Sequence, residues 1–418
     1  MGHFAPALWA SVVFSIVFLF TACGEHSSTE ASVAKEHSAH TGSGTLVFHI
    51  NDSSNIYIPG ERSEGLFTLR NGDEVLGLKR VDSLCFEVPI FNGLLCLGPE
   101  GSGVWTDVIR TGNTPYEVPC SWVPSEDNEA ANTRPLEPLN TRSWRLNFGR
   151  EDPWYGDLVM QVGTNGKAEG TIETATGDFR YLHGDVTDQH LTLQTFDGAH
   201  LFKFTGKFEG DSITDGWFAS GHHFGTPMSG ERHSAHHEPL SDGQEAVWTG
   251  LPVSFSGKNL MADETSWNWT EHRDSVHILS VMGSWCPNCL DEHRLLRDLM
   301  QEFHNVRVHT LAFERGLEQP NGEKRALRRL KQYAEEMQLW RYEDRWDITL
   351  VGPASKSEAQ NLLPFLDRVV SFPTTVVLHP DLDAPWIHSG FNGPATGVKY
   401  ELERSAMTSA LSGRSENR

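Results

Sequence analysis

The sequence predicts two folded domains in series, an all-β sandwich or barrel followed by an α/β domain. The chain has 418 residues, more than one ordinary domain holds. Short runs of β-branched and aromatic residues fill its first half, whereas strand-like and helix-like runs alternate after about Leu251. We expect a leader at 1–22, a tether at 23–44, a β-rich domain at 45–230, a His-rich linker at 231–250 and the α/β domain at 251–418.

The composition excludes two broad classes of protein. Hydrophobic residues make up 38% of the chain, which includes 13 Trp, so there is enough apolar material for packed cores and the chain is not a disordered protein. The formal net charge is -22 and no basic run interrupts it. Phosphate groups repel such a chain, so we predict no nucleic-acid partner and no binding to an anionic membrane surface.

The amino-terminal segment predicts export. It reads MGHFAPALWASVVFSIVFLFTAC, with an apolar run from Phe4 to Phe20 followed by small residues and Cys23. The run has the length of a signal-peptide core, and the residues ending at Cys23 resemble a bacterial lipoprotein cleavage box. An uncleaved membrane anchor is the alternative. We expect an exported protein of the cell envelope or periplasm, lipidated at Cys23, with a polar, flexible tether after it.

The predicted β-rich domain consists of short strands between turn signals. The signals include Asn71-Gly72, Asn92-Gly93, Asn165-Gly166 and Asp197-Gly198. Helical spacing is absent over any useful length, and residues 117–142 read as an irregular insert. The strand-like runs are TLVFHI, NIYI, LFTL, EVLGLK, WRLNF, GDLVMQV, GTIETAT, FRYLHGDV, HLTLQTF, HLFKFTGKF and SITDGWFASG.

This region also contains Cys85, Cys96 and Cys120. If Asn92-Gly93 forms a two-residue turn, Cys96 faces Pro89, and Cys85 and Cys96 are not direct cross-strand neighbours. Bridges from Cys120 to Cys85 or to Cys96 are equally open, so the sequence leaves the pairing undecided.

Five histidines precede and enter the linker, at His222, His223, His233, His236 and His237. Clustered imidazoles can bind a transition metal, but no Cys or carboxylate pair has ligand spacing with them. Loops of this composition are mostly solvated, so we predict no metal site and no cofactor.

The carboxyl-terminal part alternates strands and helices. HILSVM is a buried-strand run, and LDEHRLLRDLMQEF after it has helical spacing. Alternation of this kind predicts a sheet with parallel strands covered on both faces, and the last two strands form an antiparallel pair. The later elements are RVHTLAF, EKRALRRLKQYAEEM, ITLVG, SKSEAQNLLPFLD, VVSFPTTVVLHP, PWIHSGFNG and VKYELERSAMTSAL.

A WCPNC motif joins HILSVM to its helix. Cys286 lies where the strand ends, so the free N-H groups and positive end of the helix favour its thiolate. Pro287 fits the first helical turn, and Cys289 returns to the same face. This arrangement suits thiol-disulfide exchange, with attack by Cys286 and resolution by Cys289. A zinc site needs two more ligands that the spacing does not provide, and two inert thiols are less expected in an exported protein.

With SFPTTVVL and GFNGPATG further along, this motif resembles the TlpA/ResA branch of thioredoxin-fold disulfide reductases over residues 251 to 414. The resemblance implies a thioredoxin-like fold and a cis-proline at Pro373 facing the redox pair. It also implies that Glu292 adjusts the acidity of the thiols. Thioredoxin has a buried Asp where this chain has Ser280, so acid-base duty falls on Glu292. The alternative for Glu292 is a solvated first-turn carboxylate.

Three further residues lie near the predicted redox pair. Trp285 is expected to cover the pair and contact the client, and Phe372 is expected to shape the docking groove. Glu314 ends RVHTLAFE and ranks as a loop carboxylate.

Two classes of function follow. The first is an exported protein-disulfide reductase that acts on disulfide-containing clients and is recharged by a membrane thiol electron donor. The second is a binding or scaffold protein whose β domain holds a client while the α/β domain is a redox-sensitive dock. Within the first class, an oxidant or isomerase of the same fold remains an alternative, and the resemblance favours the reductase.

Overall fold

The computed structural model describes residues 42–52, 54–108, 116–125, 142–233, 240 and 245–414. All of them belong to one compact unit of the chain, Ala39–Arg418. The predicted leader, Cys23, the tether up to residue 41, His236 and His237 lie outside the described residues, whereas residues 42–44 of the predicted tether belong to the first strand. Among the helices of the described ranges, none combines the length and apolar character needed to cross a membrane.

The first sheet is a closed antiparallel barrel. It closes because the first strand pairs with both the second and the eighth. Phe67 and Trp122 meet edge to face inside it, with ring centroids 4.8 Å apart. The strands are β1 (Gly42–Asn51), β2 (Ser54–Arg62), β3 (Leu66–Asn71), β4 (Glu74–Arg80), β5 (Cys85–Val88), β6 (Gly93–Leu97), β7 (Ser102–Asp107) and β8 (Tyr116–Pro124).

Two predictions for this region were wrong. Cys85 lies directly opposite Cys96 and forms a disulfide with it, while Cys120 is free and buried. The connection between β5 and β6 is longer than a two-residue turn, because Val88 pairs with Gly93. Ile90 and Asn92 have positive φ values of 72° and 54° in this loop.

The predicted irregular insert at 117–142 begins as strand β8. Val118, Cys120 and Trp122 point inward and are buried, and the residues between them are more exposed. This alternation is typical of a barrel strand. Pro119 and Pro124 obscured it in the sequence, because proline usually argues against a strand.

A second antiparallel sheet follows in the same predicted β-rich region, so the region is all-β as predicted but contains a further sheet in addition to the barrel. Its end strand β10 also pairs with β11, so the sheet closes on itself. The strands are β9 (Arg142–Phe148), β10 (Trp154–Val162), β11 (Lys167–Thr174), β12 (Gly177–Asp178), β13 (Leu182–Thr187), β14 (His190–Phe196), β15 (Leu201–Glu209), β16 (Ser212–Ser220) and β17 (Phe224–Arg232).

The third sheet has the order β19-β18-β22-β21-β20-β23-β24. Strands β20, β21 and β22 are parallel, whereas β23 and β24 are antiparallel additions. The strands are β18 (Ser254–Asn259), β19 (Glu264–Asn268), β20 (Val276–Met282), β21 (Val306–Glu314), β22 (Trp346–Pro353), β23 (Thr374–Leu378) and β24 (Trp386–Ser389). The helices are α1 (Pro287–Glu302), α2 (Gly322–Glu336), α3 (Lys356–Leu362) and α4 (Val398–Leu411), with short 3-10 turns at Trp269–Glu271, Leu339–Tyr342 and Pro394–Thr396.

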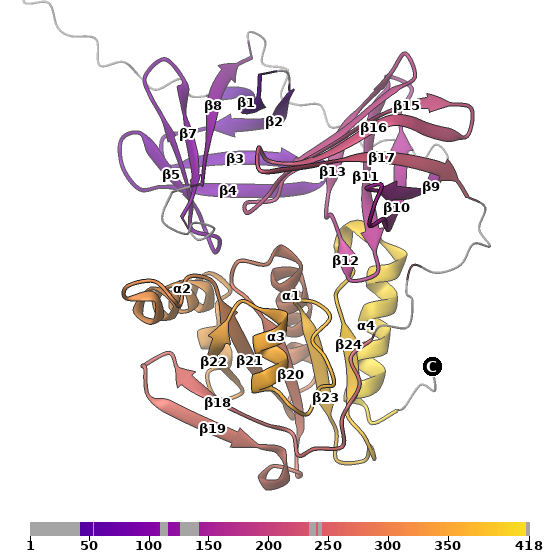
Figure 1. Cartoon of the computed structure of the whole chain (residues 1–418). Helices are drawn as coiled ribbons and strands as arrows, with labels where there is room; N and C mark the ends of the chain where they lie inside the picture. The colour runs from indigo at the N-terminus through magenta and orange to yellow at the C-terminus, as the bar shows by residue number, and fades with distance from the viewer. Residues whose placement is uncertain are drawn as a thin grey trace, which may run out of the picture. The chain divides into compact units, whose positions relative to one another are not determined.

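Helices cover both faces of this third sheet. Strand β20 is buried along its whole length, and its side chains alternate between two cores. Ile278 packs in the core that holds apolar side chains of α1, α2 and α4. Leu279 packs in the core beneath α3. Helices α1 and α3 therefore lie on opposite faces of the sheet (Figure 1). The carboxyl end of strand β20 leads directly to the start of α1.

Candidate functional site

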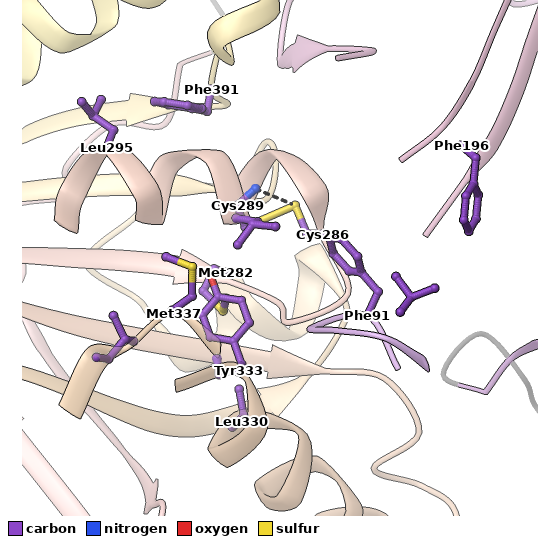
Figure 2. Packing of buried hydrophobic residues seen from close by; sticks show 14 of the residues in the cluster. Phe91, Phe196, Met282, Cys286, Cys289, Leu295, Leu330, Tyr333, Met337 and Phe391 are labelled. Carbon is purple, nitrogen blue, oxygen red and sulfur yellow. Dashed lines mark hydrogen bonds between the residues drawn. A yellow bond between two sulfur atoms is a disulfide. The ribbon is translucent and has the colours of Figure 1, made fainter. Parts of the chain in front are cut away.

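The two cysteines of WCPNC lie at the beginning of helix α1. Cys286 is the N-cap residue, and its Sγ accepts a hydrogen bond of 3.2 Å from the backbone N-H of Cys289. The two sulfurs form a disulfide (Figure 2). Cys286 is 7% exposed and Cys289 is fully buried, so a partner reaches Cys286 first. In the reduced state the same N-H group and the helix dipole stabilise a thiolate at Cys286.

The buried carboxylate of Glu314 holds the loop before the cysteines in place. Glu314 accepts hydrogen bonds from the backbone N-H of Ser284 at 2.8 Å and from its hydroxyl at 2.9 Å. Arg329 pairs with the same carboxylate at 2.9 Å. The prediction that Glu314 is a loop carboxylate was therefore wrong, because Glu314 ends strand β21 and is fully buried. It fixes the backbone that carries Trp285 and Cys286.

Phe372 and Pro373 lie beside the disulfide. The Phe372–Pro373 peptide bond is cis. The carbonyl oxygen of Phe372 lies 3.4 Å from Sγ of Cys286. The rings of Trp285 and Phe372 meet edge to face, with centroids 5.5 Å apart. Both side chains are half-buried, so together they form an aromatic border next to the more exposed sulfur.

Glu292 is fully buried in α1, one helical turn after Cys289. It accepts hydrogen bonds from the Ser280 hydroxyl at 2.6 Å and from the Thr375 hydroxyl. Burial raises the pKa of Glu292 to about 7, against the lowering effect of these two hydrogen bonds. The alternative of a solvated first-turn carboxylate is thereby contradicted. A carboxyl group with this pKa exchanges a proton near neutral pH.

A buried chain of polar groups continues from Glu292 and was not predicted. Ser280 Oγ lies 3.0 Å from Nε2 of His293, whose Nδ1 lies 2.8 Å from the hydroxyl of Tyr333. Burial lowers the pKa of His293 to about 3, so this imidazole stays neutral. Because Ser280 donates to Glu292, it accepts from Nε2-H, and the Tyr333 hydroxyl donates to Nδ1. Helical spacing alone places His293 among apolar neighbours and gives no sign of this chain.

A second buried pair lies across strand β23 from Glu292. His388 is the cross-strand partner of Thr375, and its Nε2 lies 2.8 Å from a carboxylate oxygen of Glu403. Its Nδ1 lies 3.2 Å from Glu245. Burial alone would lower the pKa of His388, but hydrogen bonds with both carboxylates raise it to about 9. The resulting positive charge opposes the rise in the pKa of Glu292.

Residues of the second sheet contact the WCPNC motif directly. Arg180 donates a hydrogen bond of 2.9 Å to the carbonyl oxygen of Pro287 and forms ion pairs with Asp291 and Glu74. Asn288 donates to the backbone carbonyl of Asp178 at 3.1 Å. A Cβ atom at Gly177 would collide with the Asn288 amide, so this approach requires glycine. The segment TGDFR had no assigned role in the sequence.

The described histidines of the predicted linker region do not gather into a metal site. The imidazole of His222 stacks on Tyr116, with centroids 4.5 Å apart, and Nδ1 of His223 lies 3.2 Å from the Tyr116 hydroxyl. His233 pairs with Asp157 at 3.5 Å. Within the ranges that the structure describes, no group of three or more His, Cys, Asp or Glu side chains is placed to hold a metal ion.

Comparisons with known proteins give structural similarities alone. No family model matches the chain, and no curated protein matches it. Solved structures of other proteins are similar, among them the following three. The thioredoxin domain of a thiol-disulfide oxidoreductase from Bacteroides vulgatus has 14% identity and a TM-score of 0.25, covering 38% of this chain and 96% of its own. A thiol:disulfide interchange protein of the thioredoxin family from Chlorobium tepidum has 15% identity and a TM-score of 0.25, covering 38% and 99%.

The third is a secreted thiol-disulfide isomerase from Corynebacterium glutamicum, with 19% identity and a TM-score of 0.24, covering 35% of this chain and 81% of its own. At these TM-scores and identities the similarities do not determine the function of this chain. We infer that function from the site itself.

Proposed function

We propose that the protein is an exported thiol-disulfide oxidoreductase that acts as a TlpA-like reductase of protein disulfides. The observation that carries this proposal is the pair Cys286 and Cys289 at the start of α1, with one sulfur near the surface and the other buried. A helix N-terminus lowers the pKa of a thiol and activates it as a nucleophile. The disulfide between the two residues is the oxidised end of the cycle.

The first step is attack of the Cys286 thiolate on one sulfur of a client disulfide. A bond forms between Cys286 and that sulfur, the client disulfide breaks, and the other client sulfur leaves as a thiolate. The Phe372 carbonyl and the aromatic border of Trp285 and Phe372 lie where the client chain must approach. We assign these residues, with Pro373, to docking of the client.

The second step releases the client and uses Glu292. Cys289 loses its proton to the carboxylate of Glu292 and attacks Sγ of Cys286, so the mixed disulfide breaks and the second client sulfur leaves as a thiolate. The two electrons that reduce the client come from the Cys286–Cys289 dithiol, which becomes a disulfide. An external thiol donor of the membrane then reduces the pair again. The leader and Cys23 support a lipid-anchored protein in the cell envelope, where such a donor works.

Cysteine variants test this mechanism. Cys286→Ser should abolish reduction of a model protein disulfide, since Cys289, the other cysteine of the site, is fully buried and out of reach of the client. Cys289→Ser should accumulate a mixed disulfide that mass spectrometry detects on Cys286. Cys120→Ala is the control, because burial raises the pKa of Cys120 to about 12 and keeps this thiol unreactive. Unchanged turnover in the Cys286→Ser variant would contradict the proposal.

A further inference from the structure

A cavity beside the redox pair is lined by four arginines. It has a volume of about 510 Å³ and lies between helix α2, the loop after β21 and residues of the barrel. Its arginines are Arg315, Arg325, Arg328 and Arg329, and Glu87 is the acidic residue in the described lining. The formal charge of these lining residues is therefore positive, whereas the chain as a whole carries -22. This concentration of positive charge distinguishes the cavity from the rest of the molecule.

Local structure explains how the arginines come together. Arg325, Arg328 and Arg329 are three and four residues apart on α2, so they share one face of the helix. Arg329 is held by the buried Glu314. Arg325 donates a hydrogen bond of 2.6 Å to Gln319, and Arg328 is exposed. Arg329 therefore has a structural role, because the Glu314 carboxylate holds it. Arg325 and Arg328 keep their positive charge, because Gln319 is uncharged and Arg328 faces solvent.

The cavity is connected to the disulfide by direct contacts. The guanidinium carbon of Arg315 lies 4.0 Å from the ring centroid of Trp285. Trp285 packs edge to face on Phe372, whose carbonyl oxygen lies 3.4 Å from Sγ of Cys286. A client chain that extends from Cys286 past Trp285 therefore meets Arg315, which lines the cavity.

We propose that this cavity binds carboxylate side chains of the client, so that the enzyme prefers disulfides in acidic polypeptide segments. The inference rests on the proposed reductase function and adds the substrate class. Arginine is suited to this task because its planar guanidinium donates paired hydrogen bonds to a carboxylate. A local positive site also guides an acidic client past the negative charge of the rest of the chain.

The test compares two peptides that contain the same disulfide. One has Asp and Glu residues beside it and the other has Asn and Gln. The full chain, reduced beforehand, is mixed with each peptide at low salt, and the second-order rate constant for oxidation of the Cys286–Cys289 dithiol is measured for both. The quantity compared is the rate constant for the acidic peptide divided by the rate constant for the neutral peptide. This ratio does not depend on the fraction of folded enzyme, because that fraction changes both rate constants equally. We expect a ratio above one in the native chain, falling as the salt concentration rises.

Two matched double variants test whether Arg325 and Arg328 cause the preference for the acidic peptide. Arg325→Gln with Arg328→Gln should lower the ratio by roughly tenfold, since each exposed ion pair contributes up to about fivefold in affinity. Lys324→Gln with Lys331→Gln removes the same charge from exposed positions of the same helix outside the cavity, and it should leave the ratio unchanged. Equal reduction of both peptides by the native chain overturns the inference, as does an equal fall of the ratio in both double variants. If the native chain reduces neither peptide, the proposed function itself fails.

Discussion

Glu292 is the buried carboxyl group that accepts the Cys289 proton in the proposed mechanism. Its side chain is fully buried, its hydrogen bonds come from Ser280 and Thr375, and its pKa is raised to about 7 by burial. Thioredoxin-like sequences with an Asp at the position of Ser280 would place the carboxylate on the strand. In this chain the carboxylate comes from the helix, and Ser280 supports it.

Replacement of Glu292 tests its role in proton transfer. Glu292→Gln keeps the size of the side chain but cannot accept the Cys289 proton. We expect the resolving step to slow by roughly 100-fold, the lower range for loss of a general base. Rapid mixing of the reduced chain with a client disulfide, with separate detection of the mixed disulfide and of the released client, measures this step. Glu302→Gln changes an exposed carboxyl of the same helix and is the control. Equal rates in native chain and Glu292→Gln would contradict the assignment.

The raised pKa of Glu292 also predicts a dependence of stability on pH. The folded state binds the Glu292 proton more tightly than the unfolded state does, because the pKa rises from 4.5 to about 7. This stabilisation is complete below pH 4.5 and disappears as the pH rises through 7. As the pH rises, the free energy of unfolding of the native chain should therefore fall relative to that of Glu292→Gln, by about 3 kcal/mol at most. Urea unfolding at pH 5 and pH 8 measures the change, and parallel pH profiles would contradict it.

Single residues of the site differ in how far the sequence reveals them. Cys286, Cys289 and Glu292 follow from helix geometry and from the family resemblance, because their spacing is local. Glu314, His293 and Arg180 do not, because their partners Ser284, Tyr333 and Pro287 are distant in the chain. Their burial is decided by packing between elements, which a single sequence does not contain.

At the scale of elements, Arg180 attaches the segment from Thr174 to Arg180 to helix α1. Arg180 is buried and pairs with Asp291 of α1 and Glu74 of β4. Arg180→Met would leave Glu74 without its arginine and would leave Asp291 with Arg294 alone. We therefore expect the free energy of unfolding to fall by about 3–5 kcal/mol. Lys167→Met removes an exposed pair with Asp185 and should change it by less than about 1 kcal/mol.

Urea unfolding of both variants checks this prediction, and similar small effects would show that the buried pairs contribute little. The same comparison bears on the WCPNC motif, because Arg180 also donates to the Pro287 carbonyl between the two cysteines. A lowered rate of disulfide exchange in folded Arg180→Met would show that the second sheet positions the motif.

Strands and helices were predictable where a short periodic pattern decides them. Strand β20 and helix α1 follow from a buried apolar run and from leucines at helical spacing. Strand β8 was missed because two prolines interrupt its alternation. The number of sheets in the β-rich region was not predictable, since closure depends on which distant strands pair, such as β1 with β8.

At the scale of the whole molecule, the barrel carries a disulfide separate from the redox pair. Cys85 and Cys96 lie in adjacent strands, at a sequence separation of 11. A bridge across a loop of this size stabilises a fold by about 2–4 kcal/mol, mainly by restricting the unfolded chain. Replacing both cysteines by Ser should lower the free energy of unfolding by that amount in urea titrations. Peptide mapping that found Cys120 paired with either residue would contradict this pairing.

The central claim is that the Cys286–Cys289 pair is a reductant. Equilibration of the soluble chain lacking its first 43 residues against defined thiol buffers gives the reduction potential of this pair. We expect a value of roughly -250 mV or lower, at which the dithiol passes its electrons to client disulfides. A value of roughly -180 to -120 mV would make the protein an oxidant or isomerase and would contradict the proposed reductase function.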